Sequence, residues 1–118
     1  MFSKSQTRKK SDAFANTIDV ANIEGQLDIH QVEVTATTSG ETLNNAGSIA
    51  FFAKGSAPNA EWQPIQKNDA NYELDLSTGV RTFDVPNSSI VGIRGVPSGI
   101  GASGGTEWTL NVISGRKG

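Results

Sequence analysis

The chain has 118 residues, of which 36% are hydrophobic, with 13 glycines and no cysteine. This length suits one domain with one modest core, and the lack of cysteine excludes disulfides, thiol catalysis and cysteine-rich zinc sites. The low apolar fraction and the many glycines indicate numerous turns and little helix. No apolar run approaches the roughly 18 residues of a membrane span, and no apolar segment follows the basic N-terminal residues as in a secretory signal. We therefore expect no membrane span and no export by the general secretory pathway.

The small net charge of −2 conceals a strong asymmetry along the chain. Residues 1–11 contain four basic residues and no acid, residues 12–115 contain twelve acids and four bases, and Arg116 and Lys117 are basic again. Basic ends on an acidic body are suited to acidic protein surfaces or to nucleic acid, while a solvated, flexible terminus is the simpler alternative.

The first 24 residues show no sustained hydrophobic period. The pattern predicts an N-terminal arm over residues 1–24, extended or partly ordered on a partner, with a short helical turn near Ser11–Ala15. Its scattered apolar residues would tie the arm to the partner's surface. A folded domain over residues 25–115 and a basic tail over residues 116–118 complete the predicted organisation.

From Leu27 onward the hydrophobic period becomes two. In "LDIHQVEVTAT" the phase slips between Ile29 and Val32, which predicts a β-bulge near His30–Gln31. Further strands are expected in "SIAFFAK", "EWQPIQ", "NYELDLS", "TGVRTFDVP", "SSIVGIRGVP" and "TEWTLNVIS", and Pro64 makes the second of these a short or edge strand. Short strands with turn clusters about every ten residues predict an all-β fold. We expect an antiparallel β-sandwich (Ig-like or jelly-roll-like) of six to eight short strands with an extended basic N-terminal arm.

Motifs that carry chemistry are weak in this sequence. His30, the single histidine, has Asp28 two residues away, but no nucleophile-elbow pattern accompanies it, and a surface or bulge histidine is the expected reading. Glu73 and Asp75 alternate as on the solvent face of a strand. The "GIGASG" stretch matches a phosphate-binding pattern, yet a strand is expected after it instead of a helix, which favours a hairpin loop. The sequence therefore predicts no enzyme, no metal site and no cofactor.

The two tryptophans are open to two hypotheses. Trp108 shares a strand face with Leu110 and Val112, so we expect it in the core. Trp62 leaves a hairpin, where it would close the sandwich as a core plug. In the alternative reading Trp62 is a platform on which a sugar ring stacks, which would make the domain a carbohydrate-binding or receptor-binding module.

The segments "FFAKGSAPNAEWQPI", "TFDVPNSSIVGIRG" and "TEWTLNVISG" follow one another in an order that resembles small β-sandwich accessory proteins in the virions of tailed phages. The resemblance covers about Ile49 to Gly115. The sequence departs from the pattern in its basic arm and in "GIRGVP", whose glycines replace the usual β-branched residues.

The resemblance implies a structural virion protein without catalytic residues, located in a virion that is assembled in the host cytoplasm. A capsid decoration (cement) subunit or a head–tail accessory subunit is expected, docking through its arm and sheet edges onto capsid, neck or tail proteins as a homo-oligomer. Nucleic acid is a less favoured partner of the basic arm, and no membrane is expected. The residues expected to dock are Lys4, Arg8, Lys9, Lys10, Phe14, Ile18 and Val20.

Overall fold

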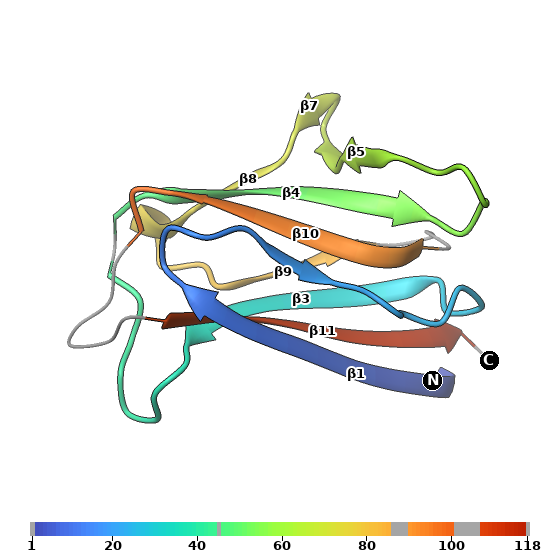
Figure 1. The fold of residues 1–118 in the computed structure, drawn as a ribbon, viewed down its shortest axis with the longest axis horizontal. Coiled ribbons are helices and arrows are strands. Elements are labelled where there is room, and N and C mark those ends of the chain that lie inside the picture. Colours follow the sequence, from blue (N-terminus) through green and yellow to red (C-terminus); the bar gives the residue numbers. More distant parts are fainter. Residues whose placement is uncertain (1, 45, 86–89, 101–106, 118) are drawn as a thin grey trace.

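The computed structural model of the chain describes residues 2–44, 46–85, 90–100 and 107–117, and it confirms the predicted all-β sandwich (Figure 1). All strand pairs are antiparallel. The strands are β1 (Phe2–Ala13), β2 (Ile18–Val20), β3 (Ile29–Ala36), β4 (Ser48–Gly55), β5 (Trp62–Pro64), β6 (Gln66–Lys67), β7 (Ala70–Asn71), β8 (Glu73–Asp75), β9 (Thr82–Val85), β10 (Ile90–Ser98) and β11 (Glu107–Lys117), with a 3₁₀ turn, η1, at Leu76–Thr78.

Two sheets form the layers of the sandwich. The first has the strand order β1-β11-β3-β9, and the second has the order β2-β10-β4-β5 with β8 also paired to β4. The strands β6 and β7 form a separate two-stranded hairpin. As expected from Pro64, β5 is a short edge strand.

The core lies between the two sheets and is made mainly by alternate residues of β2, β3, β4, β9, β10 and β11. Trp108, Leu110 and Val112 of β11 are completely buried, as the sequence predicts. On the opposing sheet, Ile49 and Phe51 of β4 are buried against them. Strand alternation therefore supplies most of the core directly.

The N-terminal segment differs from the expected arm. Phe2–Ala13 is the strand β1 and pairs with β11 along its whole length, and Ile18–Val20 is β2 and pairs with β10. The sandwich thus begins at Phe2 instead of residue 25, and β11 continues to Lys117 through most of the expected tail. No helical turn is found at Ser11–Ala15, where β1 ends and a turn follows.

The sequence pattern missed β1 because its side chains are polar on both faces. Register places Arg8 beside Val112 and Lys10 beside Leu110, so these basic residues share the sheet face of core residues. A strand at the edge of a sheet forms its ladder through backbone groups alone and needs no apolar alternation, and inward-pointing charges are common at such edges.

The predicted bulge near His30–Gln31 is wrong, because β3 pairs with β11 in continuous register from Ile29 to Ala36. The apparent slip of phase arises because His30 occupies a core position and Ile29 points to the other face. Leu27 is buried from the loop that precedes the strand. Among the described strand pairs, register irregularities instead occur between Phe2 and Lys4 and between Ile90 and Gly92.

Two glycines of β10 each make room for a tryptophan. A Cβ atom on Gly95 would lie 2.9 Å from Cη2 of Trp108 and 3.3 Å from Cε1 of Phe51, inside the core. A Cβ atom on Gly92 would lie 2.8 Å from Cη2 of Trp62, on the other face of the same strand. The glycines in "GIRGVP" therefore replace β-branched residues because indole rings occupy that space.

The loop between β10 and β11 connects two strands, as expected for "GIGASG". Gly99 has a positive φ of 69°, a conformation that suits glycine. Residues 101–106 of this loop lie outside the described residues.

The close approach of Trp108 to Gly95 predicts that Gly95→Ala destabilises the protein. The added methyl group must displace rings packed in the core, and overpacking of this kind costs about 1–3 kcal/mol. The control is Gly55→Ala in β4, where the nearest atom would be 4.0 Å from the new Cβ. Urea unfolding of both variants measures the difference, and equal stability of the two would contradict the packing described.

Candidate functional site

The edge of the first sheet gathers the positive charge of the chain. In the register of β1 with β11, Lys4 lies opposite Arg116 and Phe2 lies opposite Lys117, so the two basic ends are neighbours (Figure 1). Six of the ten basic residues thus belong to β1 and the end of β11. The remainder of the chain, residues 12–115, is strongly acidic.

The seven residues expected to dock on a partner fall into two groups. Arg8, Lys9 and Lys10 are exposed on β1, and Lys4 belongs to the same strand. Ile18 and Val20 are only 1% and 3% exposed because β2 turns them into the protein's own core. The apolar part of the prediction is therefore corrected: these residues hold the sandwich together and are not available to a partner.

Phe14 belongs to this second group. It follows β1 directly, is half-buried, and packs against the hydrophobic core. Like the residues of β2, it attaches the N-terminal strand to the sandwich and presents little surface to a partner.

β1 is fastened on its inner side and open on its outer side. The Gln6 Oε1 atom accepts a hydrogen bond of 2.8 Å from the Glu24 backbone N–H, and the Ser11 hydroxyl lies 2.7 Å from that of Thr109. Within the described part of the chain, β1 pairs with β11 and with no strand on its other side. An open strand edge presents unpaired backbone N–H and C=O groups to which another extended chain can add.

Trp62 lies on the outer face of the second sheet, which corrects the expectation of a core plug. Register places it beside Lys54 of β4, and Lys54 lies beside Gly92 of β10, so all three share the solvent-facing side. The ring is half-buried, with its end over Gly92. Trp62 is therefore neither the core plug nor the fully exposed residue of the alternative hypothesis.

Arg94 fixes the ring of Trp62. Its Nε and one terminal nitrogen donate to the two carboxylate oxygens of Asp19 at 2.7 and 2.9 Å, and its guanidinium lies 4.4 Å from the Trp62 ring centroid. The paired guanidinium holds the pKa of the Asp19 carboxyl below its ordinary value of 3.8. A bidentate pair of this kind keeps the cation in one orientation over the indole.

His30 is not the surface residue that the sequence predicts. It is completely buried, and its Nδ1 atom lies 2.6 Å from the Ser114 hydroxyl, which is itself only 2% exposed. A catalytic nucleophile must be accessible to its substrate, and the His30–Ser114 pair is enclosed in the core. The pair instead satisfies two polar groups between the sheets. Glu73 and Asp75, by contrast, are exposed as predicted.

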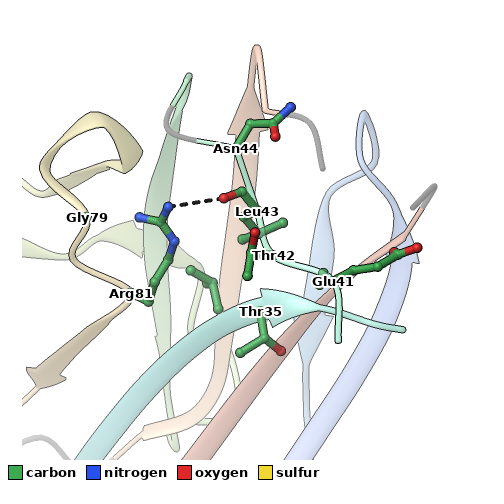
Figure 2. Close-up of a pocket in the computed structure, with 9 residues that line it drawn as sticks. Thr35, Glu41, Thr42, Leu43, Asn44, Gly79 and Arg81 are labelled. Carbon is green, nitrogen blue, oxygen red and sulfur yellow. Dashed lines mark hydrogen bonds between the residues drawn. The ribbon is translucent and has the colours of Figure 1, made fainter. Parts of the chain in front are cut away.

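A pocket of about 490 Å³ lies beside the end of β3 and is lined by Arg81, Gly79 and the loop 41–44 (Figure 2). The Arg81 guanidinium donates to the carbonyl groups of Leu43, Leu76 and Val80 at 3.3, 3.1 and 3.0 Å. Glu41 points away from Arg81 in Figure 2. Arg81 therefore connects the loop 41–44 to η1 through hydrogen bonds, which is a structural role.

Among the described residues, no group of three or more histidine, aspartate or glutamate side chains is placed to hold a metal ion. The same residues include no helix with the length and apolar character needed to cross a membrane.

Comparisons with known proteins give likenesses in fold and none in sequence. No family model matches the chain, and no curated protein matches it. The structural neighbours include phage-derived proteins. One is the SPBc2 prophage-derived protein YomS, with a TM-score of 0.42 and 10% identity over 92% of this chain and 94% of that chain. Another is a chain of the acid-stable capsid of Helicobacter pylori bacteriophage KHP30, with a TM-score of 0.48 and 10% identity over 98% and 90%.

The buried His30–Ser114 pair predicts that Ser114→Ala destabilises the protein by about 1–3 kcal/mol, because the substitution removes a hydrogen-bond partner of the buried His30 ring. Ser5→Ala, at an exposed position of β1, is the control and should change stability by less than about 0.5 kcal/mol. The double variant His30→Leu, Ser114→Ala should recover part of the loss. A Ser114→Ala protein as stable as the control in urea would show that the hydrogen bond contributes nothing.

The Asp19–Arg94 pair predicts a pH-dependent contribution to stability. Because folding lowers the pKa of Asp19, the contribution is present above 3.8 and is lost as the pH falls through the lower folded pKa. Both side chains are about one-third exposed, so we expect at most about 1 kcal/mol at neutral pH. Asp19→Asn should be less stable than the wild type at pH 7 and equally stable near pH 2. If Asp19→Asn is still less stable than the wild type near pH 2, the loss of stability does not come from the Asp19–Arg94 ion pair.

Proposed function

We propose that this chain is a structural protein of a bacterial virus, a capsid decoration or head–tail accessory subunit, which binds neighbouring virion proteins through the edge of β1. The observation that carries the proposal is β1 itself, a twelve-residue edge strand with basic residues on an otherwise acidic protein. The resemblance of the strands from Ile49 to Gly115 to phage sandwich modules supports the virion setting.

The chemistry of the edge favours an acidic, extended partner segment. Such a segment would extend the first sheet by one strand through backbone hydrogen bonds. The exposed Arg8, Lys9 and Lys10 would attract it and select its charge. Nucleic acid is the less favoured partner of the β1 edge. The acidic remainder of the protein would repel the phosphate groups of a nucleic acid bound there.

The same charges restrict how copies of this chain would assemble. A symmetric contact of β1 with β1 would bring the basic residues of both copies together, which is unfavourable. The other edge of the first sheet is β9, which carries the exposed Asp84. Strand directions alternate across this sheet, so β1 of one copy would run antiparallel to β9 of the next. Our proposal therefore includes a head-to-tail homo-oligomer, in which the basic β1 edge of one copy meets the β9 edge of the next, with its exposed Asp84.

The virion assignment predicts peptides of this chain in virus particles purified from the strain that carries its gene, detected by mass spectrometry. Recombinant protein should also co-sediment with those particles. Lys9→Glu, which reverses an exposed charge on β1, should weaken co-sedimentation on the order of tenfold at low salt. Lys67→Glu reverses an exposed lysine on β6 and is the matched control.

Two results would overturn this proposal. The chain is not a virion component if the purified particles lack it. The β1 edge is not the docking surface if Lys9→Glu and Lys67→Glu bind the particles equally well. Truncation of residues 2–16 is a poor test, because it removes β1 and uncovers β11 in the folded protein.

A further inference from the structure

We infer that the outer face of the second sheet holds a binding site for a sugar ring that carries a carboxylate, with Trp62 as the stacking surface and Lys54 as the partner of the acid. This site lies on the other sheet from β1 and goes beyond the docking role proposed above.

The sheet surface around Trp62 is shaped for a ring. Gly92 has no side chain beneath the indole, and a Cβ atom there would lie 2.8 Å from it. The ring is consequently set down against the strand β10 while it remains half-exposed. A pocket of about 530 Å³ lies here, lined by Trp62, Lys54, Ala21, Asn22, Ile23, Val91 and Gly92.

Both neighbouring cations lie over the indole ring of Trp62. Arg94 is 4.4 Å from the ring centroid and does not line the pocket, whereas the Lys54 Nζ atom is 5.9 Å from the centroid and Lys54 lines the pocket. A sugar that stacks on the indole would therefore displace the Lys54 ammonium from the ring and pair with it through the carboxylate. Arg94 is held by Asp19, so the indole has little freedom to turn. A platform fixed in this way binds without an ordering cost for its own side chain.

Lys54 supplies the preference for an acid. Arg94 is neutralised by Asp19, but in the part of the chain that the structure describes no carboxylate lies within ion-pair range of Lys54. The C–H face of a pyranose is apolar and covers an aromatic ring, while a carboxylate on that pyranose would reach the ammonium group. The exposed amide of Asn22 offers a neutral donor and acceptor to hydroxyl groups.

The test is a titration of ¹⁵N-labelled protein with methyl glucuronide and with its neutral counterpart, methyl glucoside, followed by NMR at the two indole N–H signals. The Trp62 signal should shift with the glucuronide, with an affinity about five- to tenfold higher than for the glucoside. The Trp108 Nε1–H donates to the Asn16 carbonyl from inside the core, so its signal should not move and serves as an internal reference.

Variants distinguish the stacking contact with Trp62 from the ionic contact with Lys54. Lys54→Gln should bind both sugars with the affinity of the wild type for the glucoside. Trp62→Ala has no indole signal at this position, so its binding is followed at the backbone N–H signals of Lys54 and Gly92, and neither sugar should shift them. Lys67→Gln, an exposed lysine on β6, should leave both affinities unchanged. The proposal is overturned if neither sugar shifts the Trp62 signal, or if the glucuronide shifts it equally in wild type and Lys54→Gln. Particle binding by Trp62→Ala should be intact, so failure of this site and failure of the β1 edge are distinguishable.

Discussion

The packing of two indole rings against one strand is the constraint on which much of this structure depends. β10 has Gly95 under Trp108 on its inner face and Gly92 under Trp62 on its outer face. A side chain at either position would collide with an indole ring, so both positions require glycine. One strand thereby serves two purposes. Its inner face closes the core, and its outer face carries a fixed aromatic surface.

The outer aromatic surface depends on residues that lie far apart in the chain. Asp19 of β2 orients Arg94 of β10, and Arg94 in turn holds Trp62 of β5. β2 is in place because Ile18 and Val20 are buried in the core on its other face. The N-terminal segment therefore contributes to this surface as well as to the first sheet.

The basic residues are concentrated at one edge of the sandwich. Pairing of the first strand with the last brings both basic termini to one edge, and the twelve acidic residues all lie between residues 12 and 115. An edge strand with inward-pointing charges resists pairing with copies of itself. The same edge remains open to a chain of opposite charge, which is the property that a subunit needs to join an assembly at a defined place.

Alternation of polar and apolar residues was enough to predict the all-β class, the core of β11 and the exposed face of β8, because it reports directly which face of a strand is buried. The sequence also shows that both ends are basic. It did not reveal β1, whose ladder rests on backbone groups, nor the core position of His30, which Ser114 makes possible from 84 residues away. The outward orientation of Trp62 and the meeting of the two basic ends became visible only in the folded protein, because both depend on which strands become neighbours. Local alternation carries no information about that pairing.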